Sequence, residues 1–272
     1  MSDVIRHPET LAVVGGGRMG GAIIGGLLDS GAVIAEQISV VEPTDERRVD
    51  LTAKYGVRCV AVGADALPAQ IVILAVKPQI IDSVVTDLGR LLADSLVVSI
   101  AAGVSCLRLE GMLPDATAVI RVMPNTPAMV GEGMSVVSGG TSATAKQVEL
   151  VRALFATLGK SIELDERYQD AATAISGSGP AYFALVIDAL ARAGVRQGLP
   201  REIAQTLAVQ TMLGTARLID EGGMHPEALV DGVASPGGTT IAAVEVLEAR
   251  AVRSAFAEAV AAAVHRAKEL GS

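Results

Sequence analysis

The chain has 272 residues, of which 50% are hydrophobic and 19% are charged, a composition that excludes an intrinsically disordered protein. A net charge of −8, with three tyrosines, three phenylalanines and no tryptophan, disfavours a nucleic-acid binder, which needs basic and stacking surfaces. The two cysteines, Cys59 and Cys106, form no CxxC pattern. We interpret both as buried thiols and expect no metal site.

Short apolar runs in the first part of the chain predict strands that are buried on both faces, as in a parallel sheet. They alternate with helical stretches such as 19–29 and 80–92. This alternation indicates an open α/β sheet. The predicted strands are 11–14, 38–41, 71–76, 96–100 and 119–123.

After about residue 163 the strand-like runs end and helical patterns take over. The predicted helices are 181–196, 201–220, a helix from about 239 to 249, and 251–270. The segment 203–216 carries no charged residue, which fits either a central core helix or a subunit interface. We favour an obligate dimer, because the helical part alone makes a thin core. The expected domains are 1–165, for dinucleotide binding, and 166–272, for substrate binding and dimerisation.

A G-x-G-x-x-G motif joins the first predicted strand to the first predicted helix, which is the context that a dinucleotide fingerprint requires. The first glycine permits the tight turn, the second lets a pyrophosphate approach the backbone, and the third lets helix and strand pack closely. The helix N-terminus then offers free N–H groups to the phosphates. The predicted contacts are Gly15, Gly16, Gly17, Arg18, Met19 and Gly20.

The second strand leads to Glu42, which is placed to accept a hydrogen bond from the adenosine ribose and so favours NAD. Arg47 and Arg48 follow and offer an alternative, because they are suited to a 2′-phosphate. We therefore expect NADPH or NADH as the cofactor.

Two further strand ends should lie along the same edge of the sheet and complete the cofactor site. The small residues at 101–103 leave room for a flat ring. Lys77 is either a cofactor contact, a general acid or a surface lysine. The expected contacts are Ala75, Val76, Lys77, Pro78, Ala101, Ala102 and Gly103.

The loop 235–240, with the sequence SPGGTT, combines glycines and hydroxyls in front of a helical run. Its consecutive N–H groups are suited to a small carboxylate, whereas a simple helix cap needs only one hydroxyl. The loop 176–180, SGSGP, is a second candidate for ligand contact, or a close helix-packing element with a cap.

These motifs, in order along the chain, resemble the pyrroline-5-carboxylate reductase family. The resemblance rests on the glycine fingerprint together with AVKPQ at 75–79, SIAAGV at 99–104, MPNTP at 123–127, SGSGPAY at 176–182 and SPGGTT at 235–240. It implies a Rossmann domain followed by a helical dimerisation domain. It also implies reduction of 1-pyrroline-5-carboxylate to L-proline with NAD(P)H, in the last step of proline biosynthesis.

The same resemblance implies roles for the residues of the substrate loop. Thr240 is then the catalytic hydroxyl that donates to the ring nitrogen, and Ser235 and the backbone of Gly237, Gly238 and Thr239 hold the carboxylate. Glu42 departs from the small neutral residue of many NADPH-using relatives, and Gly63 from their asparagine. Members of the family often assemble dimers into larger rings, commonly decamers.

Two other functions remain open on the residues alone. A β-hydroxyacid dehydrogenase shares the scaffold but uses a catalytic lysine near the domain junction, where Lys160 lies in a helix end that leads to a strand. A non-catalytic NAD(P) sensor would need no second anion-binding loop.

The sequence also favours a cytoplasmic protein. Asp3, Arg6 and His7 precede any apolar run, unlike a secretion signal, and the longest uncharged stretch, 171–187, is interrupted at SGSGP. We expect no catalytic role for His7, His225 or His265, because none has a triad-like neighbour.

Overall fold

The structure is a computed structural model that describes residues 8–271. Asp3, Arg6 and His7 lie outside the described residues. The chain forms two compact units, one made of residues 8–178 with 263–271 and the other of residues 179–262. The division therefore falls after residue 178, and the limits 1–165 and 166–272 stay a prediction.

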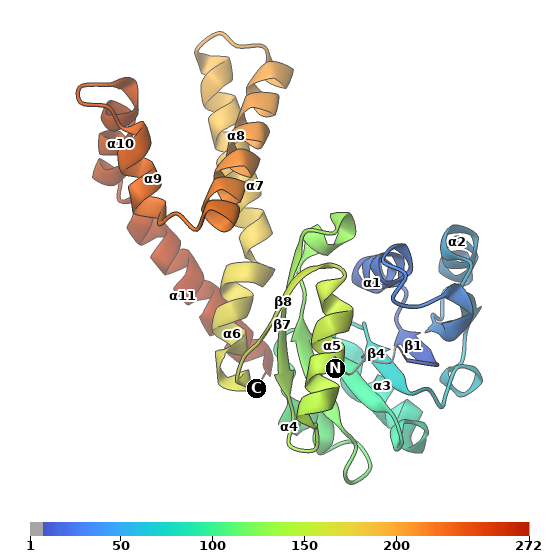
Figure 1. Cartoon of the computed structure of the whole chain (residues 1–272). Helices are drawn as coiled ribbons and strands as arrows, with labels where there is room; N and C mark the ends of the chain where they lie inside the picture. Colours follow the sequence, from blue (N-terminus) through green and yellow to red (C-terminus); the bar gives the residue numbers. More distant parts are fainter. Residues whose placement is uncertain (1–7, 272) are drawn as a thin grey trace, which may run out of the picture. The chain divides into compact units, whose positions relative to one another are not determined.

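The first unit is built on an eight-stranded sheet with the order β3-β2-β1-β4-β5-β6-β7-β8. Figure 1 labels β1, β4, β7 and β8 of this sheet. All neighbours are parallel except β6 and β7. The five predicted strands are confirmed, as is the Rossmann-type α/β class. The strands are β1 (Leu11–Val14), β2 (Ile38–Val41), β3 (Arg58–Val60), β4 (Ile71–Leu74), β5 (Leu96–Ser99), β6 (Val119–Met123), β7 (Gly133–Gly139) and β8 (Gly159–Glu163).

Helices cover both faces of this sheet, which explains why β1 and β4 are apolar throughout. Leu11 and Val13 of β1 pack in one core with α1 and α5, whereas Ala12 and Val14 pack in the other with α3 and α4. Each fully buried aliphatic side chain contributes about 1.5–3 kcal/mol. The helices are α1 (Arg18–Asp29), α2 (Asp45–Tyr55), α3 (Ile81–Leu88), α4 (Cys106–Glu110), α5 (Ala145–Ala156) and α6 (Gln169–Ala172).

The second unit is all helical, as predicted. It contains α7 (Gly179–Arg196), α8 (Arg201–Gly222), α9 (Pro226–Val233), α10 (Thr239–Ala249) and the larger part of α11 (Val252–Gly271). Pro200 precedes the first residue of α8, where its fixed φ favours helix initiation.

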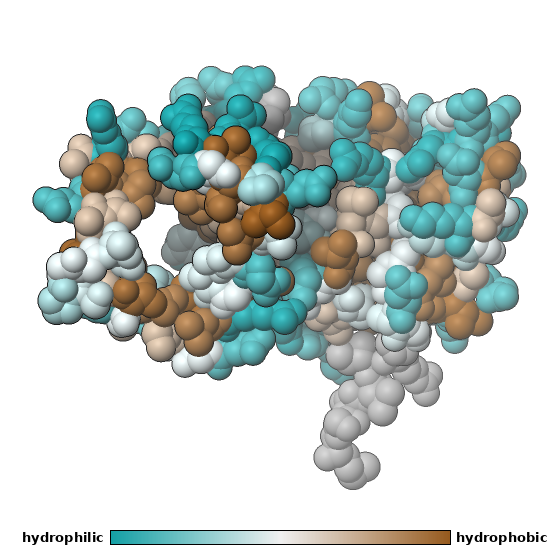
Figure 2. Space-filling model, turned by 90° about the horizontal axis from the view of Figure 1, so that it is seen from above, coloured by the Kyte–Doolittle hydropathy of each residue, from teal (hydrophilic) through white to brown (hydrophobic). Residues whose placement is uncertain are grey.

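Most large apolar side chains of the second unit are exposed. In α8 only Ala204 and Ala208 are buried, whereas Ile203 is 52% and Leu207 54% exposed. Figure 2 shows hydrophobic side chains at the molecular surface, including over the helical part. Of the two interpretations of this helix, a buried core helix of one chain is therefore wrong, and a subunit interface remains.

Among the described residues, one helical stretch, Glu166–Arg196, has the length and the mean hydropathy, 1.3, of a membrane span. Apolar helices of ordinary folded proteins pass the same criterion. This stretch begins with a 3-10 turn, Glu166–Tyr168, and contains a π-helical turn at Thr173–Gly177, the place of the predicted SGSGP interruption.

Candidate dinucleotide and substrate loops

The glycine motif forms a tight loop between β1 and α1. Gly15 has a φ of +106°, and its N–H donates to the carbonyl of Val41 at 2.8 Å. A Cβ atom on Gly15 would lie 2.6 Å from the carbonyl oxygen of Ala75, and one on Gly20 would lie 2.1 Å from that of Gly15. The first and third glycines are therefore required by close backbone approach, as expected.

The beginning of α1 is open toward a ligand. Gly17 is its N-cap, no side chain caps the helix, and its first turn carries no acidic residue. A Cβ atom on Gly17 would meet nothing within 4 Å. Free N–H groups at a helix N-terminus, without a competing carboxylate, fit a pyrophosphate.

Glu42 and two arginines surround this loop. Glu42 is 8% exposed; its Oε2 accepts from the N–H of Gly16 at 2.9 Å and its Oε1 from that of Thr44 at 3.0 Å. Arg47 donates from Nε and Nη2 to the carbonyl of Gly16, at 3.1 and 2.8 Å. Arg48 donates from Nη1 to the carbonyls of Glu42 and Pro43. Both arginines therefore bind the protein backbone.

The other predicted cofactor residues follow β4 and β5. These strands are parallel neighbours of each other, and β4 also pairs with β1, so their carboxyl ends share one edge with the glycine loop. Ala75 donates its N–H to the carbonyl of Val14 at 2.8 Å. Lys77 is exposed, and Pro78 begins a short 3-10 turn. Ala101 is buried, and Gly103 has a φ of +77°.

Sequence reasoning missed the role of Asn125, which follows β6. Its side chain is 8% exposed, its Nδ2 donates to the carbonyl of Ser176 at 3.0 Å, and its Oδ1 accepts from the N–H of Met134 at 2.8 Å. Ser176 lies in the π-helical turn, a feature frequent at functional sites. The hydrogen bond from Asn125 to Ser176 therefore links the MPNTP motif to the SGSGP motif. An asparagine between two prolines at a strand end was the available signal.

An ion-pair cluster around a buried arginine also went unnoticed. Arg121 of β6 is 5% exposed and pairs with Glu166 and Asp170, at 3.4 and 3.2 Å. Glu166 also accepts from the N–H of Cys106 at 2.8 Å. The signal was one arginine inside the apolar run 119–123.

Both cysteines are free thiols, and Cys106 is buried as expected, whereas Cys59 is half-buried. Burial first, and then the nearby Glu166 carboxylate, raise the pKa of the Cys106 thiol to about 12. This thiol therefore stays protonated and unreactive at neutral pH.

The predicted substrate loop lies in the second unit, at the start of α10. Gly237 has a φ of +68°, and the N–H of Gly238 donates to the carbonyl of Ser235 at 3.0 Å, which closes a tight turn. Gly238 is the N-cap of α10, with no side-chain cap. Ser235 and Thr239 are exposed and Thr240 is half-buried. Because no hydroxyl caps the helix, the alternative of a simple helix cap is disfavoured.

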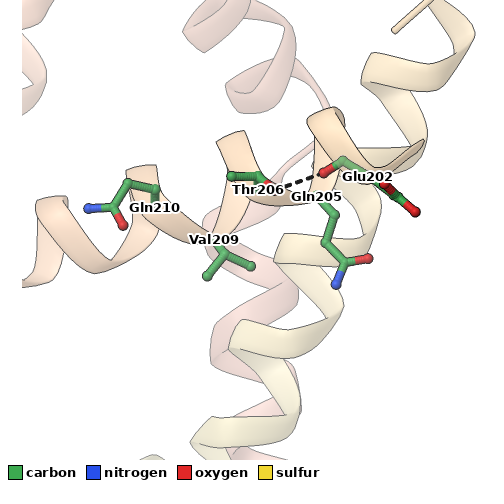
Figure 3. A pocket seen from close by; sticks show the side chains of 5 residues that line it. All are labelled: Glu202, Gln205, Thr206, Val209 and Gln210. Carbon is green, nitrogen blue, oxygen red and sulfur yellow. Dashed lines mark hydrogen bonds between the residues drawn. The ribbon is translucent and has the colours of Figure 1, made fainter. Parts of the chain in front are cut away.

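A separate hollow lies along α8 (Figure 3). The hydroxyl of Thr206, one of its lining residues, donates to the carbonyl of Glu202 at 2.9 Å within the same helix. None of the predicted site residues lines this hollow, so we do not assign the reaction to it. Its lining residues are Glu202, Gln205, Thr206, Val209 and Gln210.

Two protein-family models match the chain. Residues 166–270 match a model described as pyrroline-5-carboxylate reductase dimerisation. Residues 10–103 match one described as NADP oxidoreductase, coenzyme F420-dependent. The first model therefore covers the helical part of the chain. The second covers β1 to β5 of the Rossmann-type sheet.

Individual relatives match over nearly the whole chain. A pyrroline-5-carboxylate reductase of Synechocystis is 47% identical, with 96% of this chain and 98% of the relative covered. The structure of a Coxiella burnetii pyrroline-5-carboxylate reductase is 35% identical in sequence, with a TM-score of 0.91 over 98% of this chain and 100% of the other. A Plasmodium falciparum pyrroline carboxylate reductase with NADP bound is 31% identical, with a TM-score of 0.89 and 97% and 98% coverage. The chain therefore belongs to the pyrroline-5-carboxylate reductase family.

Proposed function

We propose that this chain reduces 1-pyrroline-5-carboxylate to L-proline with NADPH or NADH, in the last step of proline biosynthesis. The proposal is carried by two anion-binding loops in a chain of this family. One is the open glycine loop before α1, and the other is the SPGGTT loop before α10. A sensor that only binds dinucleotide has no use for the second.

The cofactor is assigned to the carboxyl edge of the sheet. The N–H groups at the start of α1 would hold the pyrophosphate, and Glu42 would accept from the ribose. The residues that follow β4 and β5 would line the nicotinamide end. When bound, the reduced nicotinamide supplies the hydride that reduces the substrate.

The substrate is a cyclic imine that carries a carboxylate. The N–H groups of Gly237 and Thr239, with the Ser235 hydroxyl, would neutralise the carboxylate, and the Thr240 hydroxyl would hydrogen-bond the ring nitrogen. The N–H of Gly238 closes the turn onto the carbonyl of Ser235, so Gly238 would shape the loop rather than donate to the substrate. The imine nitrogen enters already protonated, as an iminium. The hydride adds to the carbon of the C=N bond, the π electron pair becomes the nitrogen lone pair, to which the Thr240 hydroxyl would donate, and the product is the secondary amine of proline. A protonated imine is already electrophilic, so orientation of the ring supplies most of the catalysis.

The absorbance of the reduced cofactor at 340 nm tests this proposal directly. Purified protein with 1-pyrroline-5-carboxylate is expected to oxidise NADH or NADPH. Thr240→Ala is expected to lower kcat/KM about 100-fold, in the range of one positioned donor. Thr86→Ala is the matched control, because its hydroxyl donates only to Asp82 within its own helix.

Two outcomes would contradict these assignments. If folded protein binds dinucleotide but oxidises none with this substrate, the reductase function is wrong and the sensor is favoured. If Thr240→Ala retains the unmodified kcat/KM, Thr240 has no part in the reaction.

The chain forms a homo-oligomer, which the match to a dimerisation domain supports. We propose a dimer through the helical domain, and five such dimers in a decamer. The exposed apolar side chains of α8 support an interface between chains at this helix. Sedimentation analysis of Leu207→Asp should detect dissociated chains, and an unchanged assembly would place the interface elsewhere.

We also assign the protein to the cytoplasm, where free thiols such as Cys59 and Cys106 stay reduced.

A further inference from the structure

We propose that this chain binds NADH more tightly than NADPH, that Glu42 sets the preference, and that Arg47 serves the glycine loop rather than a 2′-phosphate. The inference rests on the proposed use of a nicotinamide cofactor. It deepens that function, because the sequence alone left open whether Glu42 favours NADH or the two arginines favour NADPH.

The Glu42 carboxylate is fixed beside the glycine loop. Both of its oxygens accept backbone N–H groups, from Gly16 at 2.9 Å and from Thr44 at 3.0 Å. It therefore cannot turn away from a ligand without breaking both hydrogen bonds. Each carboxylate oxygen retains acceptor capacity for one more donor, which the ribose 2′-hydroxyl can supply. A 2′-phosphate would instead bring a second anion to a nearly buried carboxylate, and like charges in such a site repel.

Arg47, one candidate partner of a 2′-phosphate, is already bound to the loop. Its Nε and Nη2 both donate to the carbonyl of Gly16, whose N–H binds Glu42. Glu42 therefore binds the N–H of Gly16, and Arg47 binds the carbonyl of the same residue. To clamp a phosphate with this face of its guanidinium, Arg47 would have to release the loop that binds the pyrophosphate.

Arg48, the other candidate, is held at the end of β2. Its Nη1 donates to the carbonyls of Glu42 and Pro43, both at 2.8 Å, and its Nη2 pairs with Asp45. The side chain of Arg48 is 21% exposed. Its charge is thus already offset by a carboxylate and by two carbonyl dipoles, which weakens its attraction for an added phosphate.

The test measures dinucleotide binding in the absence of the imine substrate. We expect titration calorimetry on the whole chain to give a Kd for NADPH at least about tenfold above that for NADH. Glu42→Gln should lower the ratio of the two Kd values about tenfold. The ratio is the informative quantity, since loop damage weakens both cofactors through their common pyrophosphate. Glu46→Gln, which removes an exposed charge from the first turn of α2, next to Arg47, should leave the ratio unchanged.

Arg47→Gln separates the two roles of the arginine. If Arg47 serves the loop, both Kd values rise by a similar factor and their ratio stays within about twofold. A selective loss of NADPH affinity, or tighter binding of NADPH by the unmodified chain, would overturn the proposal. Because binding is read without the imine, a chain that prefers NADH yet fails to reduce 1-pyrroline-5-carboxylate refutes the reductase function alone.

Discussion

Gly17→Ala should separate folding from cofactor binding. Gly17 has a φ of −65° and a ψ of −170°, which alanine adopts readily, and its Cβ would meet nothing within 4 Å. Alanine is a poorer N-cap than glycine by up to about 1 kcal/mol. The reduced freedom of the unfolded chain offsets this by about 0.4–1 kcal/mol. The free energy of unfolding should therefore change by less than about 1 kcal/mol.

The same methyl group would lie where a pyrophosphate must approach the backbone. Inserting one methyl group into a close-packed contact costs about 1–3 kcal/mol, which weakens binding about 5- to 150-fold. The assay is a pair of measurements, thermal unfolding of the free protein and calorimetric titration with NADH. Gly222→Ala, at an open helical position in the second unit, is the control that should leave the NADH affinity unchanged. An NADH affinity retained by Gly17→Ala would refute the close approach of the phosphates to this glycine.

Three further predictions concern the ionic groups and the thiols. Arg121→Met should destabilise the protein by about 2–4 kcal/mol in urea unfolding, because it strands the two carboxylates that pair with a buried guanidinium; an unchanged midpoint would show that water replaces the arginine. A thiol reagent at pH 8 should label Cys59 and leave Cys106 unlabelled until the protein unfolds, because burial raises the pKa of Cys106 to about 12. The hydrogen bond from Arg192, and then that from Arg201, lower the pKa of Asp188 in the folded protein. The ionised Asp188 therefore stabilises the folded state at any pH above its unfolded-state pKa, and this stabilisation is lost as the pH falls through the folded-state pKa. Asp188→Asn should therefore lower the thermal midpoint slightly at pH 7 in low salt, and a difference that persists below that pKa would contradict this cause.

Strand prediction succeeded where burial alone decides the residue types. β1 and β4 are buried on both faces, so continuous aliphatic runs mark them in the sequence. β3 has only three residues, partly exposed, and the apolar part of β7 is short and flanked by glycines and serines. These two strands and β8 were not among the five predicted strands, because pairing with β2, β6 and β7, more than their own pattern, makes them strands.

The substrate loop was identified by its composition, and the structure adds how it is made. The turn at Gly237 and the hydrogen bond from Gly238 to Ser235 leave the start of α10 without a side-chain cap. The contact of Asn125 with Ser176 was beyond sequence reasoning, because 51 positions separate the two residues along the chain.

The sequence by itself determined the glycine fingerprint, the positions of five strands along the chain, the helical second part and the resemblance to a reductase family. All of these depend on residues close together in the chain, whose steric and hydrophobic requirements are local. The tertiary structure decided what Glu42 and Arg47 bind and whether α8 is buried. Glu42 meets Gly16 across 26 positions, and large side chains of α8 such as Ile203 and Leu207 are left about half exposed in the single chain, so only the folded backbone could settle those contacts.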